Sequence, residues 1–228
     1  MIQRSGESMK KIVTLSMREQ IYEALKGLIL DNSYGPKTVL AIDRLADEFG
    51  VSATPVREAL VRLESDGLVE LIPNRGAQVS DIRAEDIRYI WEMRLLLEPY
   101  AARMSVDLVG SDEIQPLEAD VHRLSSTPDD TALYISTDIR LHEMLYLHVQ
   151  NELLKESIRR IHQMARRIRF FAEHNAKLHE KVVHEVIQEH LEIISAMQSG
   201  NPDLVEPALR HHLANGEKRT LSALRIER

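Results

Sequence analysis

Residues 45–80 read LADEFGVSATPVREALVRLESDGLVELIPNRGAQVS, and this stretch decides the fold of the first part of the chain. The spacing of its apolar residues predicts a short helix that ends near Gly50, a second helix over 53–66, and two short strands over 69–72 and 77–80. Glycine at position 50 permits the positive φ of a tight turn between the helices. Two helices joined in this way and followed by a hairpin form a winged helix-turn-helix, which lays its second helix in the major groove of DNA.

Five residues of this stretch are candidate DNA contacts. Ser52 stands where a side chain can cap the second helix, and Thr54 and Arg57 lie near the helix end that would face the groove. The Arg57 side chain can hold a guanine edge or a phosphate. Arg75 and Gly76 fall at the tip of the predicted hairpin, where a cation and a close backbone approach suit the minor groove or the phosphates. The alternative is a helical hairpin with a β-ribbon whose two arginines are only solvated.

Length and composition limit what the chain can be. Its 228 residues suffice for two modest domains, and the change of pattern at Ser80-Asp81 predicts a DNA-binding domain over 1–80 and a second domain over 81–228. There is no cysteine, and no apolar run approaches the roughly 18 residues that span a membrane. The N-terminus lacks the apolar stretch of a signal peptide. We therefore expect a cytoplasmic protein with no membrane partner.

The charge balance is unusual for a protein that binds nucleic acid. The net charge is −7, and residues 1–80 carry ten Lys and Arg against eleven Asp and Glu. Because phosphate contacts supply most of the affinity for DNA, binding would need a locally positive face and two copies of the domain. We therefore expect a homodimer on a palindromic operator, with the two recognition helices about 34 Å apart.

From Ala84 onward every long segment has helical periodicity, and no strand pattern is present. About six helices are expected, which predicts a mainly α protein with an all-helical bundle behind the winged domain. The expected helices cover 84–108, 112–125, 129–148, 152–174, 177–199 and 202–225.

The histidines are confined to this second part, because all ten lie at or after His122. Four side chains that can ligate a metal fall on apolar faces when each helix is projected at 100° per residue: Asp138, His142, His190 and His212. A buried carboxylate and three buried imidazoles are costly unless they are paired. One divalent ion, such as zinc, nickel, manganese or iron, would pair all four. The alternative is a set of core histidines that are hydrogen-bonded to carbonyl groups.

The front segment resembles a known family. GVSATPVREALVRLESDGLVE and PNRGAQVS resemble the signature of the GntR family of bacterial transcription regulators, over about residues 16–80. The resemblance implies a winged helix-turn-helix that binds an operator. The chain departs from the family at Asp43 and Arg44, where the usual order is Arg and then an acidic residue, and at Ala53, where the family usually has a polar residue. Since these positions often touch DNA, the resemblance does not imply an operator sequence.

The rear segment, about residues 84–225, resembles the FCD ligand-binding domain of the FadR-like GntR subgroup. The matching pieces are MRLLLEPYAA (93–102), DIRLH (138–142), EHLEIISAMQSGN (189–201) and ALRHHL (208–213). Many members of this subgroup hold a metal with one Asp and three His, and the matching positions are the same four that periodicity selects. Members without this set bind acyl-CoA instead, and this chain keeps the set.

Arg94 and Glu98 project onto the apolar face of their helix. Beside a metal, Arg94 would hold a carboxylate by bidentate hydrogen bonds; the alternative is an internal Arg94–Glu98 ion pair. We expect a transcription regulator, by default a repressor and not an enzyme, whose effector is a small organic or sugar acid bound by the metal and Arg94. Three alternatives stay open: a regulator that senses the metal itself, a metal-dependent hydrolase-like enzyme, and a structural metal with the effector bound elsewhere.

Overall fold

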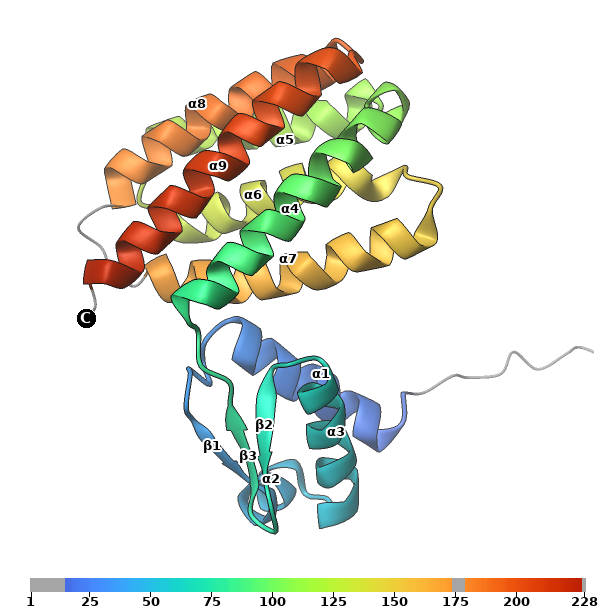
Figure 1. Ribbon diagram of the computed structural model, residues 1–228, viewed down its shortest axis with the longest axis vertical. Helices are drawn as coiled ribbons and strands as arrows, with labels where there is room; N and C mark the ends of the chain where they lie inside the picture. Colours follow the sequence, from blue (N-terminus) through green and yellow to red (C-terminus); the bar gives the residue numbers. More distant parts are fainter. Residues whose placement is uncertain (1–14, 174–178, 227–228) are drawn as a thin grey trace, which may run out of the picture. The chain divides into compact units, whose positions relative to one another are not determined.

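The computed structural model describes residues 15–173 and 179–226. Contacts between Cα atoms divide this part of the chain into two compact units. Unit 1 holds the described residues up to Ser80 except Leu30–Asn32, which join the residues from Asp81 onward in unit 2. Figure 1 shows the short sheet and small helices of unit 1 and the long helices of unit 2.

Unit 1 is a winged helix-turn-helix. In chain order its elements are α1 (Met17–Leu30), β1 (Val39–Ala41), α2 (Ile42–Phe49), α3 (Ala53–Ser65), β2 (Val69–Ile72) and β3 (Gly76–Val79). The sheet has the order β1-β3-β2, and both pairs are antiparallel. Strand β1 was not predicted, because three residues that run directly into α2 show no alternation long enough to indicate a strand.

Glycine at position 50 makes the turn between α2 and α3. Gly50 has φ 64° and ψ 38°, and its N–H donates to the carbonyl groups of Ala46 and Asp47. A side chain would be strained in this left-handed conformation. Ser52 occupies the position before α3, but its hydroxyl makes no capping hydrogen bond. The predicted side-chain cap is therefore wrong: the extended backbone of Ser52 (φ −73°, ψ 163°) begins the helix without it.

One face of α3 builds the core of unit 1. Its buried side chains follow the spacing i, i+3, i+4 and i+7: Val56, Ala59, Leu60 and Leu63. Because burial of one large aliphatic side chain contributes about 1.5–3 kcal/mol, this stripe fixes the orientation of α3. Thr54 and Arg57 are therefore held on its exposed side.

Unit 2 is all-helical in its described residues. Its elements are α4 (Ala84–Ser105), the 3-10 turn η1 (Val106–Leu108), α5 (Ser111–Ser126), α6 (Thr131–Leu147), α7 (Glu152–Glu173), α8 (His179–Gln198) and α9 (Pro202–Ile226). The predicted mainly α fold with a rear bundle of about six helices is confirmed. Among the described residues, no helix combines the length and the apolarity that crossing a membrane requires.

Helix α6 lies at the centre of unit 2. It contacts α4, α5, α7 and α8, and Figure 1 shows it behind α4 and among the other helices. Its buried side chains lie on several sides of the helix, and they include the carboxylate of Asp138 and the imidazole of His142. A helix enclosed in this way carries polar groups where little water reaches, so each needs a partner from the protein or a bound ion.

A proline inside α4 ties this helix to α9. Pro99 has no N–H, so the carbonyl of Leu95 one turn earlier loses its helical partner. Arg210 of α9 donates to that carbonyl at 3.0 Å. The bond holds together the two helices that carry Arg94 and His212.

Candidate metal centre and nucleic-acid interface

The predicted DNA contacts lie at two places on unit 1. Ser52, Thr54 and Arg57 stand at the beginning of α3 and are exposed, and Arg75 is exposed in the turn between β2 and β3. A helix end and a wing tip are the parts of this fold that meet a groove and its flanking phosphates. The structure therefore leaves these four residues accessible to a duplex, and their contact with DNA stays a prediction.

The described arginines of unit 1 fall into two groups. Three of them pair with carboxylates: Arg18 with Glu58, Arg44 with Glu48 and Arg62 with Glu19. Arg57 and Arg75 make no ion pair with any described residue. Unpaired, exposed guanidinium groups can meet phosphates or base edges without first losing a partner.

Gly76 has a task within the sheet. It is buried with φ 139°, and a Cβ there would lie 2.0 Å from the carbonyl oxygen of Leu40. The missing side chain lets β1 approach β3, where Ala41 pairs with Gly76. The fold therefore uses this glycine to bring two strands together, and the predicted contact of Gly76 with DNA stays a prediction.

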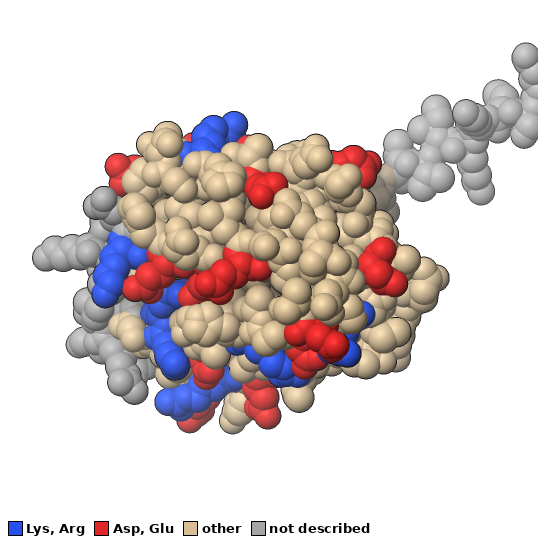
Figure 2. All heavy atoms as spheres, turned by 90° about the horizontal axis from the view of Figure 1, so that it is seen from above, with Lys and Arg blue, Asp and Glu red and all other residues tan. Residues whose placement is uncertain are grey.

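Unit 2 presents a different surface. Figure 2 shows acidic and basic side chains interspersed with uncharged ones, and the described residues on that face form no broad area of Lys and Arg. Mixed charge of this kind gives little attraction for a polyanion.

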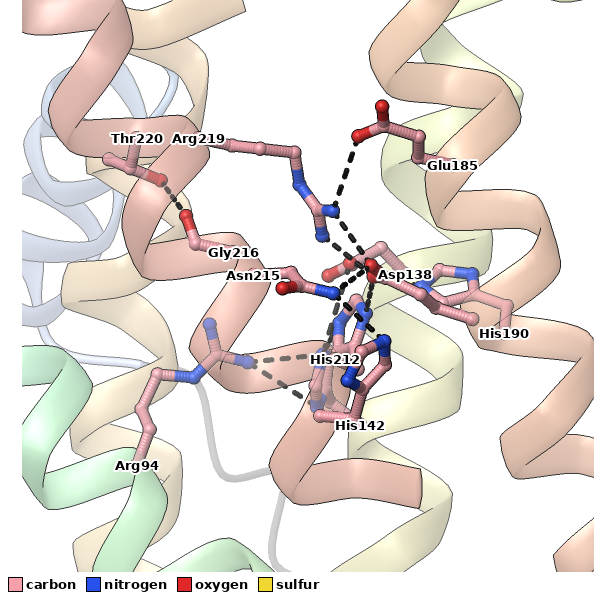
Figure 3. A network of polar contacts seen from close by, with 12 residues as sticks. Arg94, Asp138, His142, Glu185, His190, His212, Asn215, Gly216, Arg219 and Thr220 are labelled. Atoms are coloured by element: carbon pink, nitrogen blue, oxygen red, sulfur yellow. Dashed lines mark hydrogen bonds and ion pairs between the residues drawn. The ribbon is translucent and has the colours of Figure 1, made fainter. Parts of the chain in front are cut away.

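The four predicted ligands converge inside unit 2 (Figure 3). Asp138 and His142 come from α6, His190 from α8 and His212 from α9. Each is at most 3% exposed. Side chains that are far apart in the sequence therefore share one buried cage, as periodicity predicted, and their role as metal ligands stays a prediction.

The donor atoms of the cage face one another at distances close to ligand spacing. Nε2 of His142 lies 3.2 Å from Nε2 of His212. Oδ1 of Asp138 lies 3.5 Å from Nε2 of His190 and 3.9 Å from Nε2 of His142. Donors that each bind one ion at about 2.1 Å are roughly 3.0–3.4 Å apart. Asp138, His142 and His212 each offer a donor atom within 4.8 Å of the others, whereas His190 lies outside that group and close to Asp138, so binding of all four to one ion would require His190 to move.

Two carboxylates outside the cage lie close to the Nδ1 atoms of His142 and His212. Nδ1 of His142 lies 2.7 Å from Oε2 of Glu98, and Nδ1 of His212 lies 2.8 Å from Oε2 of Glu189. An ionised Glu189 accepts from Nδ1–H of His212, so Nε2 of that ring keeps its lone pair on the side that faces the cage. For His142 the contact is equally close, but Oε2 of Glu98 makes no hydrogen bond with any described residue, so the tautomer of this ring is not set by it. Metal-ligating histidines typically have such a carboxylate partner.

The protonation states suit a metal. Burial is the main cause that lowers the pKa of His142 to about 4 and that of His212 to about 3, so both rings are neutral at pH 7. Burial alone would raise the pKa of Glu98, but Arg94 and the neighbouring rings hold it well below its usual range. Neutral imidazoles backed by an ionised carboxylate are the forms that ligation requires.

Glu189 is held by three neighbours. Its carboxylate accepts from Nη1 and Nη2 of Arg219 at 2.8 and 2.7 Å, from Nδ2 of Asn215 at 2.8 Å, and from His212. Burial opposes ionisation, but the hydrogen bonds from Arg219 and His212 outweigh it and hold the pKa of Glu189 below its usual range. Its negative charge is therefore kept beside the cage, where it orients one ligand.

Both alternatives for Arg94 are compatible with its contacts. Nε donates to Oε1 of Glu98 at 2.6 Å, which is the internal ion pair. Nη2 lies 3.0 Å from Nε2 of His142, at the edge of the cage. Since Nε2 cannot both ligate a metal and accept from Arg94, ligation would free one N–H of Arg94 for a carboxylate.

The ring of His190, one of the four cage residues, has no hydrogen-bond partner in the part of the chain that the structure describes. The residue is 0% exposed, and neither ring nitrogen has a hydrogen-bond partner among the described residues. An unpaired buried polar group costs about 1–3 kcal/mol. An ion bound by Nε2 of His190 and by Asp138 would remove that cost for Nε2. One carboxylate oxygen and three imidazole nitrogens are a donor set that fits a divalent first-row metal.

His162 of α7 lies close to the cage but was not among the predicted ligands. Its Nε2 lies 2.9 Å from Oε1 of Glu98, and Glu98, His142 and His162 form a second group of close donor atoms. His162 follows buried Ile158 by four residues and precedes buried Ala165 by three. The projection that found the other histidines would therefore have placed this one on the apolar face as well.

Two models of known families match the chain. The model of bacterial regulatory proteins of the gntR family matches residues 17–79, and the FCD domain model matches residues 89–215, which is more than half of the chain. The chain belongs to the GntR family and carries an FCD domain. Members of this family are DNA-binding transcriptional regulators and not enzymes, so the hydrolase-like alternative is not supported.

Curated relatives span most of this GntR regulator. The transcriptional repressor RspR of Escherichia coli K12 is 27% identical over 202 residues, which cover 88% of this chain and 87% of RspR. The galactonate operon transcriptional repressor of the same strain is 24% identical over 227 residues, which cover 91% of this chain and 98% of that repressor. Full-length relatives of this kind confirm that both units belong to one regulator.

Solved structures share the fold of the regulator. McbR/YncC of E. coli has a TM-score of 0.75 at 20% identity, covering 94% of this chain and 99% of its own. A GntR regulator from Rhodococcus sp. RHA1 has a TM-score of 0.74 at 21% identity, covering 90% and 97%. The FCD domain of TM0439, described as metal-free, has a TM-score of 0.54 at 22% identity, covering 64% and 99%. At these identities the likeness concerns the fold alone.

Proposed function

We propose that this protein is a repressor that releases its operator when a small carboxylate binds at a metal site in unit 2. The observation that carries the proposal is the buried cage of four ligand side chains in which both nitrogens of His190 lack a partner. The ion would be held by Asp138, His142, His190 and His212. As a Lewis acid it would bind one carboxylate oxygen, and the freed N–H of Arg94 would hold the other.

The names of two relatives support the repressor and acid parts of the proposal. RspR is named a transcriptional repressor, and the galactonate operon repressor is named after an operon for a sugar acid. A carboxylate is also the ligand that a cationic cage with an adjacent guanidinium binds best. We therefore propose an organic or sugar acid as the effector.

We further propose that unit 2 forms a homodimer through α4. Five apolar side chains spaced three or four residues apart are 42–62% exposed along one face of this helix: Tyr89, Met93, Leu96, Tyr100 and Met104. A continuous apolar stripe on a protein surface is typical of a partner interface. The same helix carries Arg94 on its buried side, so an effector that moves α4 would act on the pairing of two copies.

Replacing Leu96 with glutamate should convert the dimer to a monomer. A charge in the middle of an apolar interface has no partner and must be desolvated, which costs several kcal/mol. Sedimentation velocity measures the change, and we expect a mass near the 26.1 kDa of one chain. Leu204→Glu on α9 is the control, because Leu204 is also half exposed but lies outside the stripe. A dimeric Leu96→Glu protein would contradict the assignment of α4.

We propose that Ser52, Thr54, Arg57 and Arg75 contact the operator in the cytoplasm, where bacterial DNA lies. Arg57→Ala should weaken operator binding by about 1–3 kcal/mol, or about fivefold to 150-fold, because an unpaired guanidinium at the start of α3 is lost. Fluorescence anisotropy with a labelled operator measures the effect. Arg123→Ala is the control, since it removes the same charge from an exposed residue of unit 2. Equal losses in both variants would show that only net charge matters.

Operator release tests the regulatory part of the proposal. The purified protein is stripped with chelator, and operator binding is measured with metal alone, with acid alone and with both. The proposal expects release only when both are present. Release by metal alone would identify the ion as the signal and support a metal sensor.

A further inference from the structure

Two buried N–H donors next to each other in α4 lack hydrogen-bond partners among the described residues. Arg94 uses Nε on Glu98 and Nη2 on His142, while its Nη1 has no hydrogen-bond partner among the described residues. The indole Nε1 of Trp91 is also buried and lacks a partner there. The two groups are neighbours, because Cζ of Arg94 lies 4.2 Å from the centroid of the Trp91 ring.

The indole is fixed in place from its other side. Trp91 is 6% exposed, and its benzo edge packs on Gly216 of α9. A Cβ at Gly216 would lie 2.8 Å from Cη2 of Trp91, which is closer than real Cβ contacts. The glycine therefore makes room for the ring, and the ring is wedged between the guanidinium and α9.

The chemistry of these donors selects a ligand group. Indole N–H and guanidinium groups only donate, so neither can satisfy the other. Leaving both unpaired costs about 1–3 kcal/mol each. A group that only accepts satisfies both, and a positive charge beside Arg94 favours an anion. A carboxylate meets both conditions, whereas a sugar hydroxyl brings a donor of its own.

Combined with the proposed function, on which this inference rests, the geometry points to a dicarboxylic acid as the effector. One carboxylate of a short-chain dicarboxylate binds at the metal cage, and the second accepts from Nη1 of Arg94 and Nε1 of Trp91. Trp91 is then a residue that determines specificity, and it distinguishes diacids from monoacids of the same length.

The chain contains a single tryptophan, so its fluorescence reports on Trp91 alone. The metal-loaded full-length protein is titrated with three diacids, malonate, succinate and glutarate, and with the matched monoacids propionate, butyrate and valerate. Calorimetry measures affinity in the same samples. We expect at least one diacid to bind about tenfold or more tightly than its matched monoacid, since a hydrogen bond to a charged group is worth about 1.5–3 kcal/mol. Its binding should change the Trp91 emission.

Trp91→Phe keeps an aromatic ring for packing and removes the N–H. This variant should retain metal and monoacid affinity but lose about tenfold in affinity for the preferred diacid. Equal affinities for every diacid and its monoacid in the wild-type protein would overturn the inference and leave the proposed carboxylate site standing, with the donors satisfied by water. Binding of no acid at all, with metal still bound, would overturn both. The wild-type comparison stands by itself if Trp91→Phe fails to fold.

Discussion

The His190→Ala protein will not retain a metal, and its stability will no longer depend on one. A ligand present at a thousand times its dissociation constant stabilises the folded state by about 4 kcal/mol. In a domain of this size that corresponds to a rise in melting temperature of roughly 10 °C. We expect this rise on adding metal to the stripped wild-type protein, and no rise in the variant. Differential scanning calorimetry and metal analysis of the dialysed protein measure the two effects.

Without metal, the melting temperatures of the wild-type protein and the His190→Ala variant should differ much less. In the stripped wild-type protein, His190 is buried with both nitrogens unpaired, so its removal relieves a desolvation cost while it opens a cavity. His211→Ala is the matched control, because His211 neighbours His212 on α9 but is exposed. It should bind metal like the wild type. If the His190→Ala protein kept both its metal and the thermal shift, the cage would not be the metal site.

The periodicity of single helices placed the four cage residues on buried faces, but it would have placed His162 on such a face as well, so the resemblance to the FCD domain was needed to choose the four. Asp138 and His142 are four residues apart on α6, so they share a face whatever surrounds the helix. His190 and His212 lie among apolar residues whose burial is a local property of α8 and α9. Because the helices of a small bundle share one core, side chains that face it from different helices lie close together. The sequence was therefore informative wherever the relevant pattern lay within one element.

Contacts between residues of different helices or strands could not be predicted from the sequence. Thirty residues separate Glu189 from Arg219, and no spacing rule connects a residue of α8 with one of α9. Likewise, Gly76 is a glycine because Leu40, far earlier in the chain, lies against it in the sheet. From the sequence we expected a close approach to DNA at that glycine, and no pattern indicated the contact with a second strand. Tertiary contacts alone decide such questions.

Glu189→Gln should weaken metal binding without abolishing it. In the native protein an ionised carboxylate accepts from Nδ1–H of His212 and leaves Nε2 free to ligate. An amide has no charge, and if its NH₂ group faces the ring, His212 must carry its proton on Nε2 instead. Loss of such an outer carboxylate typically lowers metal affinity tenfold to a hundredfold, which is about 1.4–2.8 kcal/mol. Competition with a chromophoric chelator measures this affinity.

The stoichiometry distinguishes this effect from the loss of a ligand. At saturating metal, Glu189→Gln should still bind one ion per chain, whereas His190→Ala should not. Glu192→Gln is the control, because it makes the same chemical change on an exposed residue of the same helix. If Glu189→Gln matched the wild type in metal affinity, the carboxylate would serve only to anchor Arg219, and the tautomer of His212 would have to be set by the ion itself.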